Sequence, residues 1–99
     1  MLLRNDNSVF NLVSDGLGIE SHAAIASGWG DYDNDGDFDL LIPSVFDFNT
    51  FTYRTALMRN DGPNGTGGRI FTVFDSVFAP TMHAQSSWAD FDGDGDLDL

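Results

Sequence analysis

The chain has no cysteine and very little positive charge. Of its 99 residues, 4 are basic and 16 acidic, giving a formal net charge of −12, and all four basic residues are arginines. Without cysteine it forms neither disulfides nor thiolate zinc sites. Nucleic acid is excluded as a partner, because phosphate binding needs clustered Lys or Arg. No apolar run approaches 18 residues, so we expect no membrane insertion.

The acidity is concentrated in two short segments. Ten of the fifteen aspartates lie in Asp31–Asp39 and Asp90–Asp98, which both read D-x-D-x-D-G-x-x-D and begin 59 residues apart (90 − 31). A carboxylate at every second position with glycine at the sixth is typical of loops that surround a hard cation with oxygen ligands. Two copies at one period predict repeated structural units.

Calcium fits this pattern best. In such loops, positions one, three and five supply side-chain oxygens, position seven its backbone carbonyl, and a later acid the last carboxylate. We therefore expect the glycines at position six to turn the chain, and the position-seven carboxylates to point at water. Magnesium prefers a stricter octahedron, and zinc would favour His or Cys. The predicted ligands are Asp31, Asp33, Asp35, Asp37 (carbonyl) and Asp39, then Asp90, Asp92, Asp94, Asp96 (carbonyl) and Asp98.

About two Ca²⁺ per chain are expected, which would change the formal charge from −12 to −8. An acidic solvated turn is the plain alternative, and it explains a matched pair of loops less well than one loop. An EF-hand or dockerin loop needs an acid at position twelve, where the first loop has Ile42, followed by a strand-like Leu-Leu-Ile-Pro pattern. Thrombospondin-type calcium repeats depend on cysteines.

Runs rich in Val, Ile, Phe, Thr and Tyr alternate with Gly, Asn and Asp clusters, so we expect an all-β fold. Asn60–Gly68 has the composition of a hairpin loop. The predicted strands are Val9–Val13, Ala23–Trp29, Asp39–Val45, Thr52–Arg59, Ile70–Phe74 and Ser86–Ala89.

The repeat extends beyond the loops. Leu3–Asp6 matches Met58–Asp61 as an Arg-Asn-Asp segment, which we interpret as a turn, and Ser27–Trp29 matches Ser86–Trp88 before each loop. Together these motifs resemble the FG-GAP/VCBS repeat family, whose calcium-loop blades form β-propellers such as those of integrin α-subunits. The resemblance implies four-stranded antiparallel blades: the end of one blade in 1–22, a complete blade in 23–80 and the start of another in 81–99. The family's metal positions carry over to the ten aspartates above.

The resemblance also implies a function. We expect a non-enzymatic segment of an extracellular or cell-surface protein in which structural calcium supports adhesion or binding of a protein or glycan. Its other expected partners are further blades of the same protein or copies of itself. Any signal peptide would lie upstream, because the first residues lack its basic and apolar regions. The alternative is an accessory propeller of a larger secreted enzyme, such as a polysaccharide-degrading one.

Other residues are assigned plainer roles. We expect Trp29 and Trp88 to pack between blades, and His22 and His83 to lie at strand ends or on the surface, because no nucleophile or metal ligand stands at a telling spacing from either. The segment Val45–Tyr53 holds four aromatic residues. We interpret it mainly as packing and, less simply, as an exposed binding surface.

Overall fold

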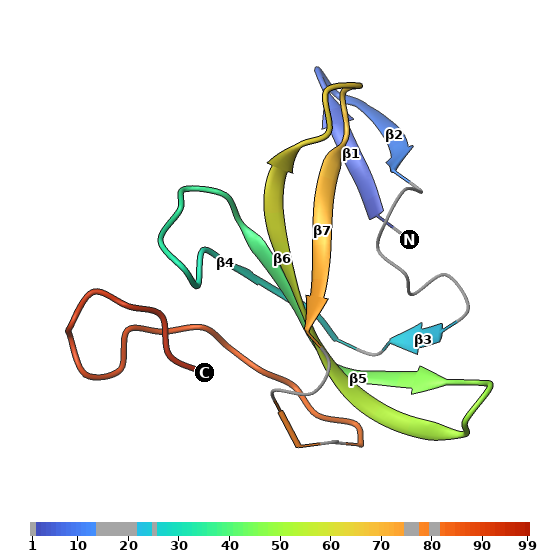
Figure 1. The fold of residues 1–99 in the computed structure, drawn as a ribbon, viewed down its shortest axis with the longest axis vertical. Helices are drawn as coiled ribbons and strands as arrows, with labels where there is room; N and C mark the ends of the chain where they lie inside the picture. Colours follow the sequence, from blue (N-terminus) through green and yellow to red (C-terminus); the bar gives the residue numbers. More distant parts are fainter. Residues whose placement is uncertain (1, 14–21, 25, 75–77, 80–81) are drawn as a thin grey trace.

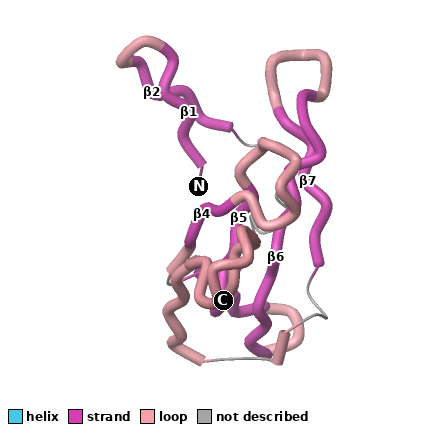
Figure 2. Tube along the Cα trace, turned by 90° about the vertical axis from the view of Figure 1, so that its left-hand side faces the viewer, coloured by secondary structure: helices cyan, strands magenta, loops and turns pink. Residues whose placement is uncertain are grey.

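A computed structural model of the chain describes residues 2–13, 22–24, 26–74, 78–79 and 82–99. They form two antiparallel sheets, so the expected all-β class is confirmed (Figures 1 and 2). Within these residues no helix is long and apolar enough to span a bilayer. The strands are β1 (Leu2–Asp6), β2 (Val9–Val13), β3 (His22–Ala24), β4 (Gly28–Gly30), β5 (Asp39–Asp47), β6 (Thr52–Pro63) and β7 (Arg69–Phe74).

The smaller sheet is the hairpin β1–β2, in which Asp6 pairs with Val9. Its two-residue turn consists of Asn7 and Ser8, both at positive φ (54° and 71°). Positive φ at both central residues is the conformation that matches the twist of hairpin strands. The Arg-Asn-Asp segment precedes this turn within β1, and its second copy lies within β6. Our interpretation of the segment as a turn was therefore wrong.

The larger sheet has the order β3–β5–β6–β7, and β4 pairs with β5 on the same side as β3. β3 pairs with the end of β5 at Val45–Asp47, whereas β4 pairs with its beginning at Asp39–Leu41. The single strand predicted at Ala23–Trp29 is therefore divided into two short pieces. The predicted strand order across this sheet is otherwise observed.

The segment Ser86–Ala89 is not a strand. Only an isolated bridge forms there, with hydrogen bonds in both directions between Ala89 and Asp98. One bridged pair does not make a ladder of paired residues, so no strand forms here. The predicted hairpin loop Asn60–Gly68 is real but shorter, because β6 continues to Pro63 and β7 begins at Arg69.

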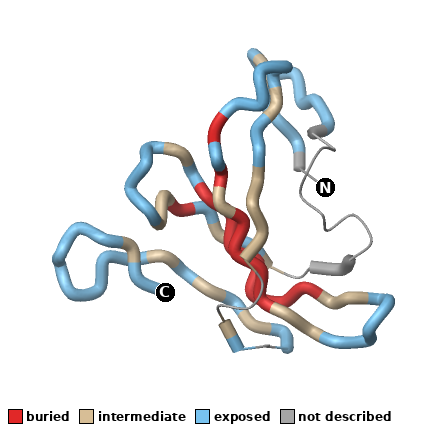
Figure 3. Tube along the Cα trace, in the orientation of Figure 1, coloured by how far each residue is buried: buried red, intermediate tan, exposed pale blue. Residues whose placement is uncertain are grey.

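The core lies where β5 and β6 pair (Figure 3). Leu40 is opposite Met58 and Ile42 opposite Ala56, and Val45 completes this buried cluster, with Phe71 and Val73 packed against it. Leu41 and Leu57 are paired on the other face of the sheet and are also buried. Because both faces of β5 are covered over this stretch, its first residue, Asp39, begins inside the fold. This position matters for the acidic loop that precedes it.

Candidate metal centre

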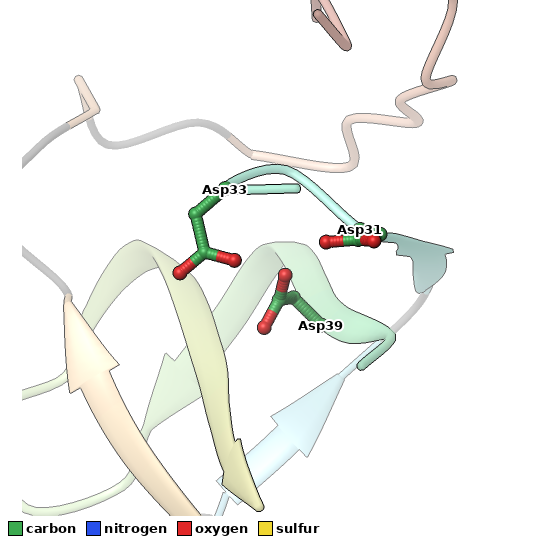
Figure 4. Close-up of side chains that lie close together, drawn as sticks. All are labelled: Asp31, Asp33 and Asp39. Atoms are coloured by element: carbon green, nitrogen blue, oxygen red, sulfur yellow. The ribbon is translucent and has the colours of Figure 1, made fainter. Parts of the chain in front are cut away.

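The first acidic loop connects β4 to β5. Gly30 pairs with Asp39, so the sheet holds both ends of the loop together. This brings the carboxylates of Asp31, Asp33 and Asp39 toward one another, with one oxygen of each within 4.8 Å of the others (Figure 4). Calcium–oxygen bonds of 2.3–2.6 Å allow two ligands of one ion to lie up to roughly 5 Å apart. The donor set and its spacing therefore fit Ca²⁺.

Asp39 is the buried member of this group, with an exposed fraction of 0%. Its Oδ1 accepts a hydrogen bond from the backbone N–H of Asn60 at 2.7 Å, and its Oδ2 one from that of Tyr32 at 3.1 Å. Burial raises the pKa of Asp39; the two N–H donors oppose the rise, and the charges of Asp33 and Asp35 add to it. These N–H donors are neutral, so a cation would stabilise the ionised carboxylate further.

The loop folds around Asp31. The backbone N–H of Asp35 donates to Asp31 Oδ1 at 3.0 Å, and that of Gly36 donates to Asp31 Oδ2 at 2.9 Å. Two residues at positive φ allow this path, Asn34 at 59° and Gly36 at 92°. Glycine adopts the second value without the steric cost that a Cβ would add. The predicted sharp turn at position six is thus observed.

The second loop has a similar structure, but the Oδ1 of its first aspartate, Asp90, accepts from the N–H of Gly93 at 2.7 Å, one position earlier than the Asp35 donor of the first loop. Oxygens of Asp90, Asp92 and Asp98 lie within 4.8 Å of one another. Gly95 N–H donates to Asp90 Oδ2 at 3.1 Å, and Phe91 N–H to Asp98 Oδ2 at 2.8 Å, as their counterparts do in the first loop. Positions four and six again have positive φ. The two loops also differ in burial, because all three of these aspartates are exposed.

The other four predicted ligands lie outside these two carboxylate groups. Asp35 and Asp94 each accept a hydrogen bond from the backbone N–H two residues later, at 2.8 and 2.9 Å. The position-seven carboxylates do not simply face water, contrary to our expectation. Asp37 Oδ2 is 2.7 Å from Arg69 Nη1, and Asp96 Oδ1 accepts a hydrogen bond from Asn34 Nδ2 at 2.7 Å.

Sequence reasoning missed three supporting residues. Asn60 is buried, and besides its contact with Asp39 its side chain donates to the Phe38 carbonyl at 3.2 Å. Arg69 binds the loop from the start of β7. Asn34 was detectable, because position four holds Asn in one loop and Gly in the other, the two residue types that most readily adopt positive φ. The sequence carried no such signal for Asn60 and Arg69, because one lay inside the predicted hairpin loop and the other just before the predicted strand Ile70–Phe74.

The two tryptophans occupy different environments. Trp88 packs over β4: its Nε1 is 3.4 Å from the Gly28 carbonyl oxygen, and a Cβ at Gly30 would lie 2.8 Å from its ring. Trp88 is therefore packed against the larger sheet, and its place between two blades stays a prediction. Trp29 is 45% exposed and lies 6.5 Å from Phe71 between ring centroids. It borders a cavity of about 620 Å³ with Leu3, Phe38 and Phe71.

The predicted surface residues behave mostly as expected. His83 is exposed, with its ring 5.9 Å from that of Tyr53. His22 belongs to β3.

Arg4 and Arg59 have equivalent roles, each with its Nε bound to the aspartate two residues later, at 2.9 and 2.7 Å. The recurrence of this ion pair supports the predicted repeat at the level of side chains.

The aromatic residues at the β5–β6 turn are partly exposed. Phe48 and Phe51 are 54% and 77% exposed, and both rings contact Phe46, at 5.0 and 6.3 Å between centroids. Phe51 has a positive φ of 55°, which is uncommon for a bulky residue. Packing alone, as predicted first, thus accounts for Phe46 better than for the other two.

Comparisons with protein-family models, with curated proteins and with solved structures each found no match. The resemblance to FG-GAP/VCBS repeats therefore remains one of motifs and their spacing.

Proposed function

We propose that this chain is a calcium-binding segment of FG-GAP/VCBS-like β-propeller repeats, in which each acidic loop binds one Ca²⁺. The observation that carries the proposal is the pair of three-carboxylate groups at equivalent positions of the two loops. An isolated acidic turn has no need to gather its first, third and ninth side chains. Recurrence 59 residues later (90 − 31) favours a shared ligand over chance.

The metal would be structural. Asp31, Asp33 and Asp39 would hold it in the first loop, and Asp90, Asp92 and Asp98 in the second; the carbonyls at position seven and the carboxylates of Asp35 and Asp94 are the further donors. Bound Ca²⁺ would neutralise charges that otherwise repel by about 4 kcal/mol per pair at 4 Å near a protein surface. It would also fix the connection between β4 and β5, so that metal binding is coupled to folding.

An extracellular or cell-surface location is consistent with this role, because extracellular calcium modules work at roughly 10⁻⁴–10⁻³ M. The partner of the assembled protein would be a protein or a glycan. The cavity beside Trp29 and the exposed aromatic residues Phe48 and Phe51 are the surfaces that support such binding. We propose no catalytic role for this segment, since its acidic groups are assigned to metal binding.

The test is a titration of Ca²⁺ into the chelator-treated chain, monitored by calorimetry and by circular dichroism. We expect saturation near two ions per chain with a gain of β signal and a midpoint near 10⁻⁴–10⁻³ M. Asp33→Asn should remove the first site, so that saturation falls to one ion per chain. Mg²⁺ serves as the matched control ion, which should bind more weakly. No binding up to about 10 mM Ca²⁺, ten times the weak end of the extracellular range, would refute the proposal.

A further inference from the structure

The two acidic loops are in direct contact. The side-chain amide of Asn34, at position four of the first loop, donates to Asp96 Oδ1, at position seven of the second, at 2.7 Å. Both loops lie on the same side of the molecule (Figure 1). The residues are 62 positions apart, so the contact depends on how the two repeat units pack. This hydrogen bond links the two loops directly.

In each loop, the carboxylate at position seven binds a side chain that lies outside that loop. In the first loop, Arg69 of β7 holds Asp37 at 2.7 Å. In the second loop, the corresponding carboxylate of Asp96 is held by Asn34, which belongs to the first loop itself. Asn34 lies between the predicted ligands Asp33 and Asp35, so a cation that orders them also orders the donor to Asp96.

A second contact lies behind the loops. Leu97, next to Asp96, has its Cδ1 atom 3.0 Å from where a Cβ on Gly30 would lie, and Gly30 directly precedes the first loop. Trp88, two residues before the second loop, packs on the same strand. Both ends of the second loop are thus seated on the strand that leads into the first.

The first loop is also the better anchored of the two. Its Asp39 is buried and bound by Asn60 of β6, whereas Asp98 is exposed and belongs only to an isolated bridge with Ala89. We infer that the loops are coupled sites: Ca²⁺ fills the first loop at lower concentration and, through Asn34 and Asp96, raises the affinity of the second. This inference rests on the calcium function proposed above.

The direction in which Asp33→Asn changes the Ca²⁺ affinity of the second loop distinguishes coupling through the contact from the effect of the first loop's charge alone. A calcium-filled first loop carries five aspartates and two positive charges, a net −3, whereas an unfilled loop with Asp33→Asn carries −4. The more negative neighbour would attract Ca²⁺ to the second loop more strongly. Contact-mediated coupling predicts the opposite, because the unfilled loop no longer holds Asn34 in place.

The experiment follows each loop separately in the full chain. The backbone amide resonances of Gly36 and Gly95 are recorded by ¹⁵N NMR during a Ca²⁺ titration of the wild type, Asp33→Asn and Asn34→Gly. Glycine retains the positive φ at position four and is the residue that the second loop has there, at Gly93. Asn34→Gly therefore removes the contact with Asp96 and preserves the path of the first loop.

In the wild type we expect the Gly36 signal to respond first. Each variant should raise the Ca²⁺ midpoint at Gly95 about five-fold, the lower end of ordinary coupling between sites. In Asn34→Gly the midpoint at Gly36 should stay unchanged. An unchanged or lower Gly95 midpoint in both variants, or earlier filling of the second loop, would overturn the coupling and leave the calcium function intact. Absence of any response at both glycines would overturn both.

Discussion

Gly30 is the position where a single added methyl group should push Trp88 and Leu97 away from β4. A Cβ built there would lie 2.8 Å from both Cδ1 and Cγ of Trp88, and 3.0 Å from Cδ1 of Leu97. These distances are below van der Waals contact. Both Trp88 atoms belong to the rigid indole ring near its attachment point, so the ring and the backbone that carries it must shift. Gly28, two residues earlier on the same strand, faces the same ring at 3.6 and 3.7 Å, which an added methyl group tolerates.

The expected cost of Gly30→Ala follows from two opposing effects. Overpacking of this kind destabilises by about 1–3 kcal/mol. Replacing a strand glycine by alanine reduces the entropy lost on folding and returns roughly 0.5–1 kcal/mol. With the middle of each range, about 2 and about 0.75 kcal/mol, the net loss should be about 1 kcal/mol. Gly28→Ala receives the same entropic gain without the collision, so its stability should be equal to or slightly above that of the wild type.

Urea unfolding of the two variants in saturating Ca²⁺, monitored by tryptophan fluorescence, measures this difference directly. Trp88 lies at the altered contact, so its emission should also shift toward that of an exposed indole in Gly30→Ala alone. Equal stabilities and spectra for the two variants would show that Trp88 does not pack on β4 as described. The reasoning about how the two units contact each other would then be wrong.

Two further predictions concern the loops and their surroundings. Gly36→Ala places a Cβ at φ 92° with no heavy atom within 4 Å, so only backbone strain of about 1–2 kcal/mol is added, and the Ca²⁺ midpoint of the first loop should rise by up to about thirty-fold. Gly65→Ala, at φ 81° in the β6–β7 turn, has the same strain and should lose stability in a melting experiment without weakening Ca²⁺ binding. Hydrogen bonds from Thr72 and then from Arg59 lower the pKa of Asp61. Its contribution to stability is therefore present above the unfolded pKa of about 3.9 and is lost as pH falls through the lower folded pKa. Asp61→Asn should make unfolding of the chain less sensitive to acid below about pH 4; an unchanged pH profile would contradict the assigned bonds.

The sequence predicted strands well where local chemistry and pairing agree. The β-branched and aromatic runs at Val9–Val13 and Arg69–Phe74 form strands within one residue of the expected bounds. The Arg-Asn-Asp segments were misassigned because Asn and Asp favour turns. In the fold Asn5 pairs with Phe10 and Asn60 with Phe71. Pairing across the sheet overrides the local preference of Asn and Asp for turns, and the composition of the segment itself does not show that pairing.

The same division holds at the metal centre. The carboxylates that gather in each loop are at most eight residues apart, so spacing alone placed them. The groups that support the loops lie far away in sequence: Asn60 is 21 residues from Asp39, and Arg69 is 32 from Asp37. Such contacts depend on the register of β5, β6 and β7. They could be predicted only after the sheet itself was known.

Near-identity of the two loops in sequence does not give them identical surroundings. The first receives Asn60 and Arg69 from later strands of its own unit, whereas the contacts of the second with the larger sheet come through Trp88, Leu97 and Asp96. Its order therefore depends on the unit before it. In this chain, the strand that leads into the first acidic loop is also the surface on which the second acidic loop is seated.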